Sequence, residues 1–139
     1  MLYKMLYYIV FIIYKHNQWL TGIQLPLGTD VGKGLYFHHF GSIVFNNNVH
    51  IGDYCTVFQE VTVGLVLGPG GGNPVIGDNV VLSAGAKVIG RVRIGNNVMV
   101  GAGAVVVKDI PDNAVAVGVP ARVVSLNGKE HLKYYIKHT

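Results

Sequence analysis

Large aliphatic or aromatic residues recur at every sixth position through the middle of the chain, with two interruptions. These thirteen positions are Leu25, Val31, Phe37, Ile43, Ile51, Val57, Val63, Ile76, Leu82, Val88, Ile94, Val100 and Val106. A glycine often follows, as in Ile51-Gly52 and Ile76-Gly77. A fixed internal period indicates a repeat architecture. A six-residue repeat is too short for two helices, but it suits one short strand and one corner.

Three such repeats complete one turn of a triangular solenoid, so thirteen repeats predict an all-β solenoid, a parallel β-helix of about four coils. The recurring side chains are expected to point inward and stack coil upon coil. The period is interrupted between Ile43 and Ile51, where the step is eight residues, and between Val63 and Ile76, where it is thirteen. The first interruption predicts a corner widened at Phe45–Asn48. The second predicts a glycine-rich loop at Leu65–Pro74. Such loops are often binding elements, although a passive surface loop is the alternative.

The first residues form the most apolar stretch of the chain. Met5–Tyr14 is an unbroken apolar or aromatic run between Lys4 and Lys15. As a helix this run would be about 15 Å long, too short for a hydrocarbon core of about 30 Å. One alternative is a helix that packs on the solenoid or against its copies in an oligomer. The other is a peripheral membrane anchor formed by residues 1–19. In both cases the helix is expected to cover the open end of the solenoid.

The predicted organisation therefore has three parts: an N-terminal apolar helix at 1–20, a β-helix domain at 21–124 and a C-terminal helical tail at 125–139. The tail is basic, with a short helix expected over Lys129–Lys137. It has no catalytic signature, and we expect it to cap the solenoid or to stabilise an oligomer.

The amino-acid composition limits the classes of function that the chain can have. Only 13% of the 139 residues are charged while 50% are apolar, so some surface is expected to be buried in an oligomer. The net charge is +4, but the chain has no cluster of lysines and arginines of the kind that binds nucleic acid. Cys55 is the single cysteine, which excludes an intramolecular disulfide and agrees with a cytoplasmic location. Its place in the repeat suggests a small core residue.

His38 and His39 are the only adjacent histidines. Imidazole is well suited to remove a proton from a hydroxyl near neutral pH, because the free side chain has a pKa of about 6.5. The alternative is a pair of solvated corner residues. The pair lies close in the repeat to both interruptions, which favours a functional role.

Three runs of sequence together resemble the serine acetyltransferases, a group of the hexapeptide-repeat acyltransferase superfamily. They are Gly34–His39, Ile51–Gly64 and the ending Gly101–Val124, which contains Gly118-Val119-Pro120-Ala121-Arg122. The resemblance implies a left-handed parallel β-helix, a homotrimer with active sites between subunits, and acetyl-CoA as the acyl donor. The left hand comes from the resemblance alone, because parallel strand connections are otherwise right-handed.

The resemblance also implies roles for individual residues. His39 falls on the catalytic base, which would deprotonate the acceptor hydroxyl for direct attack on the thioester. Ala84 and Ala102 fall where the backbone contacts the pantetheine arm of the coenzyme. Lys108 and Arg122 fall where basic side chains meet its phosphates, the alternative being ordinary surface cations.

Three positions depart from the family pattern. The aspartate before the catalytic histidine is His38, and the aspartate that orients this histidine is Gln24. Both replacements are expected to support the base without a negative charge. The second active-site histidine is replaced by Asn73, which becomes a candidate acceptor-binding residue. Since the groups that recognise serine are mostly changed, the sequence favours a sugar hydroxyl of a surface polysaccharide or its precursor, acetylated in the cytoplasm, at the inner face of the membrane.

Three alternatives remain open. The first is a genuine serine O-acetyltransferase of cysteine biosynthesis. The second is a catalytically inactive structural trimer, which the lost carboxylates would explain. The third is a metalloenzyme of carbonic-anhydrase type, which needs three histidines converging on one metal. His38, His39 and His50 are the candidates, but neighbouring residues of a strand point to opposite sides, so we expect no metal site.

Overall fold

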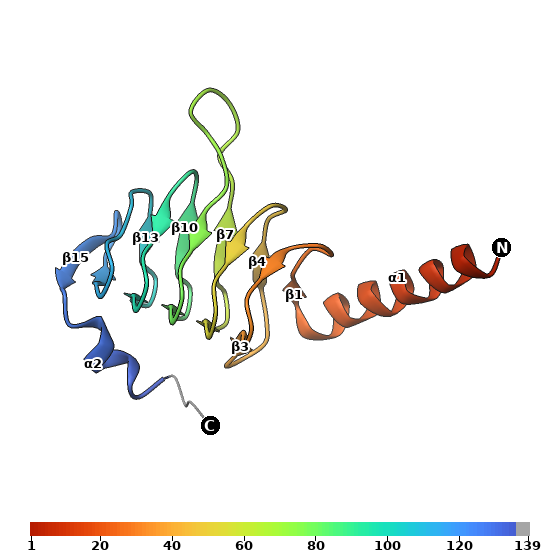
Figure 1. The fold of residues 1–139 in the computed structure, drawn as a ribbon, viewed down its shortest axis with the longest axis horizontal. Coiled ribbons are helices and arrows are strands. Elements are labelled where there is room, and N and C mark those ends of the chain that lie inside the picture. The colour runs from red at the N-terminus through yellow and green to blue at the C-terminus, as the bar shows by residue number, and fades with distance from the viewer. Residues whose placement is uncertain (136–139) are drawn as a thin grey trace.

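Three β-sheets form the sides of a prism in the computed structural model, which describes residues 1–135 (Figure 1). Sheet A contains β1 (Ile23–Gln24), β4 (Ile43–Phe45), β7 (Thr62–Gly64), β10 (Lys87–Ile89) and β13 (Val105–Val106). Sheet B contains β2 (Asp30–Val31), β5 (His50–Ile51), β8 (Val75–Ile76) and β11 (Arg93–Ile94). Sheet C contains β3 (Tyr36–Phe37), β6 (Thr56–Val57), β9 (Val81–Leu82), β12 (Met99–Val100), β14 (Val115–Val117) and the antiparallel β15 (Arg122–Ser125).

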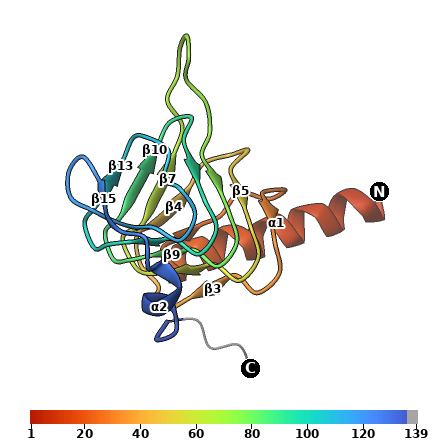
Figure 2. The same ribbon diagram turned by 60° about the vertical axis from the view of Figure 1, so that its left-hand side comes forward.

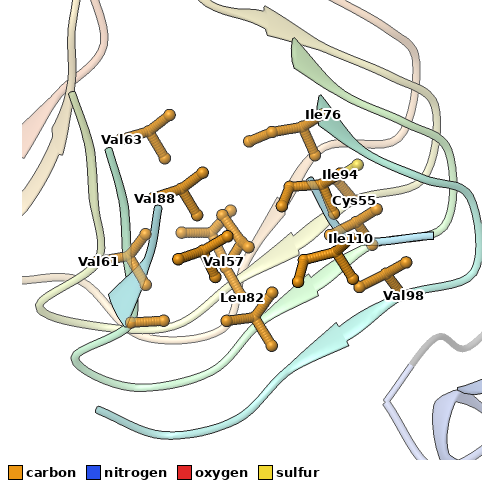
Figure 3. Close-up of a cluster of buried hydrophobic side chains, with 14 of the residues drawn as sticks. Cys55, Val57, Val61, Val63, Ile76, Leu82, Val88, Ile94, Val98 and Ile110 are labelled. Atoms are coloured by element: carbon orange, nitrogen blue, oxygen red, sulfur yellow. The ribbon is translucent and has the colours of Figure 1, made fainter. Parts of the chain in front are cut away.

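The six-residue period is the structural repeat of the coils. In sheet B, Val31, Ile51, Ile76 and Ile94 lie in register on consecutive strands. Figure 3 shows such side chains pointing inward from all three sides into one core, which is sealed from water. Four complete coils, each with one strand per sheet, confirm the predicted number, and β13, Ile110 and β14 add a fifth. Close packing of β-branched side chains along the axis is what holds these very short strands together.

The widened corner lies one corner earlier than predicted. Phe45, not Ile43, pairs with Val63 of the next coil, so Phe45 is the repeat residue of sheet A here. The step from Phe37 to Phe45 is therefore eight residues, and the step from Phe45 to Ile51 is six. Ile43 and Phe45 are both buried apolar residues, which is why spacing alone assigned the wrong one. The two extra residues fall in the corner 38–42, which carries both adjacent histidines.

The second interruption is a projecting loop, as predicted. Residues 65–74 leave β7 and return to β8 as a narrow hairpin closed by a bridge between Val66 and Gly72. The loop rises from the junction of sheets A and B, away from the prism (Figures 1 and 2). Its position on one face agrees with the general behaviour of insertions in solenoids.

The corners after sheet B carry a ladder of side-chain caps. The carboxylate of Asp78 accepts a hydrogen bond from the backbone N–H of Asp53 at 2.8 Å, and the Asn96 side chain accepts one from the N–H of Asp78 at 2.8 Å. Each cap reaches the coil before it across a glycine, such as Gly52 or Gly77. Satisfying these otherwise unpaired amides stabilises every turn of the solenoid.

Helix α1 (Leu2–Thr21) projects from the first coil instead of lying across it (Figures 1 and 2). It ends at Gly22, which adopts a left-handed conformation with φ of 67°. The Tyr14 hydroxyl donates a hydrogen bond to the Leu25 carbonyl at 2.9 Å, so only the C-terminal half of α1 holds the solenoid. The expectation that the helix covers the open end is therefore wrong, and Val31 and Phe37 in the first coil are only half-buried. No helix among residues 1–135 is long and apolar enough to cross a membrane.

The C-terminal segment covers the outer face of sheet C. Helix α2 (Gly128–Leu132) buries Leu132 against β12, and the outward-facing Thr56 and Val81 are also buried on this side. This helix is shorter than the predicted Lys129–Lys137, whose last two residues lie outside the described part of the chain. The tail thus covers a side of the prism rather than its end.

Cys55 is a core residue, as predicted. Its side chain is 1% exposed, and its Sγ donates a hydrogen bond to the Gly77 carbonyl at 3.2 Å. Burial raises the pKa of the Cys55 thiol to about 11, because the thiolate would lose its hydration. The thiol therefore stays protonated and unreactive at neutral pH.

Candidate functional site

His39 lies on one edge of the prism, where sheet C turns into sheet A. We call the corner segments 38–42, 58–61, 83–86 and 101–104 the histidine edge. Hydrogen bonds align them: Glu60 N–H donates to the Gly41 carbonyl at 3.0 Å, and Gly103 N–H donates to the Ala84 carbonyl at 2.9 Å. The histidine edge therefore runs along the solenoid, with His39 at the end nearest α1.

The two imidazoles are held differently. The His38 ring stacks on Phe58 of the next coil, with ring centroids 4.5 Å apart and an interplanar angle of 25°. The His39 ring stands edge-on to His38, with centroids 4.6 Å apart. Both side chains are exposed. His38 is thus fixed by an aromatic support, and His39 is the imidazole that is free to meet a ligand.

The contact of Phe58 with His38 was not predicted from the sequence, although the six-residue period places the two residues next to each other. Phe37 and Val57 are paired repeat residues, so the residues that follow them, His38 and Phe58, must lie over each other outside the core. Tyr135 of the C-terminal tail reaches the other side of Phe58, with ring centroids 6.0 Å apart. The described part of the tail therefore reaches the histidine edge at Tyr135.

Ala84 and Ala102 occupy equivalent corners of the histidine edge. Their backbone N–H groups make no hydrogen bond with any residue from 1 to 135, whereas those of their neighbours Gly85 and Gly103 are paired. A Cβ added at Gly103 would meet only open space. This row of small residues with free donors fits an extended chain that carries amides, such as a pantetheine arm, lying along the solenoid.

The two predicted cations are placed at separate points of the last coil. Ala121 N–H donates a hydrogen bond to the Val105 carbonyl at 2.8 Å, which brings Arg122 to the start of β13 and thus to the histidine edge. Lys108 follows the end of β13, on the way to the next corner. Both side chains are exposed. Of these two predicted cations, Arg122 is the one that adjoins the histidine edge within one chain; Lys87 also reaches this edge, where its Nζ donates a hydrogen bond to the Gly85 carbonyl at 3.5 Å.

Gln24 and Asn73 do not meet His39 within one chain. Gln24 is exposed on β1, beside Val44 of β4, and no hydrogen bond joins it to His39 among the described residues. Asn73 lies at a different corner, between sheets A and B, where its side-chain oxygen accepts a hydrogen bond from Asn46 at 3.3 Å. A site that contains both His39 and Asn73 would need two subunits.

Comparison with known proteins supports the predicted relationship. Residues 73–108 match the family model described as bacterial transferase hexapeptide (six repeats). The serine acetyltransferase of Bacillus pumilus is 37% identical over 128 residues, which are 91% of this chain and 59% of that protein. A serine acetyltransferase solved in complex with cysteine superimposes with a TM-score of 0.67 and 35% identity, covering 70% of this chain and 41% of that one. Another, solved in complex with CoA, gives a TM-score of 0.63 at 34% identity, with coverages of 69% and 39%.

The chain is a serine acetyltransferase-like member of the hexapeptide-repeat superfamily. Its β-helix is left-handed, as the resemblance implied and against the general preference for right-handed connections. The chain spans 59% of the length of its Bacillus pumilus relative, so the relationship covers the β-helix and not the whole of these relatives.

The electrostatics of this serine acetyltransferase-like site are unusual for a histidine base. Neither His38 nor His39 is hydrogen-bonded to a carboxylate among residues 1–135. The one imidazole–carboxylate pair in this part of the chain joins His50 Nδ1 to Asp30 Oδ2 at 2.7 Å, on the outer face of sheet B. No other carboxylate among residues 1–135 therefore takes the place of the two aspartates that the sequence lacks.

Proposed function

We propose that this chain is an O-acetyltransferase that uses acetyl-CoA and His39 as its base. One observation carries the proposal: an exposed imidazole begins a row of small corners whose N–H groups at Ala84 and Ala102 are free to bind a linear amide-bearing chain. The serine acetyltransferase solved with CoA supports the same class of donor. In this proposal Arg122 and Lys108 bind the phosphates of the coenzyme, and no metal takes part.

The proposed chemistry is a direct transfer. His39 takes the proton of the acceptor hydroxyl while the hydroxyl oxygen attacks the thioester carbonyl. The tetrahedral intermediate collapses by breaking the C–S bond, and the leaving thiolate takes the proton from the imidazolium. The products are an acetyl ester and CoA, and no acyl-enzyme forms. In this proposal a free backbone N–H of the histidine edge stabilises the developing oxyanion.

His38 and Gln24 support the base in this proposal without a carboxylate. His38 limits the rotation of His39 by an edge-on contact and is itself held by Phe58. Gln24 offers an amide, which can orient a ring nitrogen but does not stabilise the imidazolium as an aspartate does.

The proposed acceptor is a sugar hydroxyl of a surface polysaccharide or its precursor, with serine as the second candidate. The sequence changes at His38, Gln24 and Asn73 favour a sugar, while the names of the relatives favour serine. A thiol-release assay with acetyl-CoA decides between them when L-serine is tested beside sugars and sugar phosphates. We expect turnover with a sugar. Turnover with serine alone would contradict the sugar acceptor. Binding of CoA without turnover of any compound tested would mean that the site is inactive or that its acceptor lies outside the panel.

The proposed assembly is a homotrimer with sites between subunits, in which Asn73 of one subunit faces the acceptor at His39 of another. Helix α1 offers an argument for it, because one of its faces carries aliphatic residues at a 4-3 spacing, interrupted by one histidine. This seam consists of Leu2, Leu6, Ile9, Ile13, His16 and Leu20. Isoleucine at successive core positions of such a seam favours three or four helices over two. The aliphatic side chains of the seam are exposed in the single chain.

Two variants at neighbouring residues, one in the seam and one outside it, test this assembly. Ile9→Asp places three carboxylates together on the proposed axis, so we expect light scattering to show dissociation toward smaller species at micromolar concentration. Tyr8→Asp adds the same charge outside the seam and is expected to leave the trimer intact. Equal behaviour of the two variants would contradict the seam. A monomeric wild type that sediments with anionic vesicles would favour the membrane-anchor alternative at the inner face of the membrane.

A further inference from the structure

A groove of about 630 Å³ lies between α1 and the first coil of the solenoid. Its lining includes Phe11, Lys15, His16, Gln18, Trp19 and Gln24. The size is that of a small-molecule site, which is typically about 300–1,000 Å³. The groove has two aromatic rings, two amides and two basic groups, and no acidic residue lines it.

The groove adjoins the histidine edge through the end of α1. Gly22, which ends the helix, packs on the corner that carries His39: a Cβ at Gly22 would lie 2.9 Å from the Ser42 nitrogen and 3.2 Å from Gly41 Cα. The Gly22 carbonyl also accepts a hydrogen bond from Ile43 N–H at 3.0 Å. The C-terminal end of α1 is therefore fixed on the corner segment that carries His39.

Trp19 has no structural role in the single chain. Its side chain is 89% exposed, although an indole is the largest apolar group available for packing. An exposed aromatic ring next to amide side chains is a combination that suits a sugar, since the ring covers the apolar C–H face and the amides bind hydroxyls. Lys15 adds a positive charge on the same side.

We propose that this groove binds the acceptor, and that the acceptor is a sugar that carries a negatively charged group such as a phosphate or carboxylate. In this arrangement Trp19 stacks on the sugar, and Gln18 binds a hydroxyl through the N–H that it does not donate to Tyr14. Lys15, which also donates a hydrogen bond to Gln18 Oε1 at 3.3 Å, binds the anionic group. Serine fits poorly, because its ammonium group would find no acidic partner among the lining residues. The inference rests on the proposed acetyl transfer for the role of the ligand, but the binding itself can be measured without it.

Trp19 is the only tryptophan of the chain, so its fluorescence reports directly on the groove. The probes are glucose 1-phosphate, N-acetylglucosamine 1-phosphate and glucuronic acid, with glucose, inorganic phosphate and L-serine as comparisons. We expect saturable quenching or a spectral shift with at least one anionic sugar, a weaker response with glucose, and none with serine. Equal responses to inorganic phosphate and to the sugar phosphates would overturn the sugar specificity.

A pair of lysine variants on the same helix completes the test. Lys15→Ala is expected to weaken binding of the anionic sugar about tenfold, as befits the loss of one charged hydrogen bond. Lys4→Ala removes the same charge outside the groove and is expected to bind as wild type. No fluorescence response to any anionic sugar at millimolar concentration, or equal losses in both variants, would overturn the inference.

Thiol release separates this inference from the proposed function. A sugar that changes Trp19 fluorescence but is not acetylated would leave the groove established as a binding site and refute its role in holding the acceptor. A sugar that is acetylated without any effect of Trp19→Phe or Lys15→Ala on its KM would leave the activity established and place the acceptor elsewhere.

Discussion

His39→Ala is expected to lower kcat for thiol release from acetyl-CoA by about 10²–10⁴-fold, the usual contribution of a general base. The hydroxyl of the acceptor must lose its proton as it attacks, and the other imidazole of the histidine edge, His38, is stacked on Phe58. The side chain of His39 is exposed, so its removal should not unfold the chain. Steady-state thiol release with the best acceptor, beside the thermal unfolding of the same samples, is the measurement.

The control is another exposed histidine of the solenoid. His50→Ala removes an imidazole of the same kind on sheet B, where its partner is Asp30, and is expected to keep wild-type kcat. His38→Ala should fall between the two, because it removes the contact that limits the rotation of His39. If His39→Ala retains activity, or His50→Ala loses as much, the assignment of His39 as the base is wrong.

The coil architecture could be predicted because one physical rule repeats along the chain. Each short strand needs an inward apolar residue, so the period survives even where the strands contain only two residues. The position of the widened corner could not be predicted in the same way. Ile43 and Phe45 are both apolar and buried, and only the pairing of Phe45 with Val63 shows which of them continues the stack.

The alignment of His39 with Ala84 and Ala102 follows from the same period and a correct resemblance. Gln24 and Asn73 could not be placed relative to His39 from the period, because Asn73 lies at a different corner and Gln24 makes no hydrogen bond with His39 among residues 1–135. The direction of α1 could not be predicted from the sequence either. A helix that is apolar on nearly every side has no face that selects the solenoid as its partner, and the structure anchors it only through Tyr14 and Gly22.

The glycines that follow the repeat residues are not equivalent, and replacing two of them by alanine is expected to affect stability to very different extents. A Cβ at Gly77 would lie 2.5 Å from the Asn96 Oδ1 cap and 2.9 Å from the backbone of Gly95. At Gly64 the nearest atom would be the flexible end of Ile89, 3.3 Å away. Neither glycine has a φ in the left-handed region, so space rather than backbone strain decides the effect.

Gly77→Ala is therefore expected to lower the free energy of unfolding by about 1–3 kcal/mol, the cost of overpacking a site that cannot relax. The clash pushes apart two coils and breaks the bond from Asp78 N–H to the Asn96 side chain. Gly64→Ala should change the free energy of unfolding by less than about 0.5 kcal/mol, because the Ile89 side chain can move aside. Urea unfolding of both variants at one protein concentration measures this, since assembly would otherwise shift the midpoints. Equal destabilisation would mean that both glycines are needed for their backbone conformation. It would contradict the proposal that the close contact between Gly77 and the Asn96 cap requires a residue without a side chain.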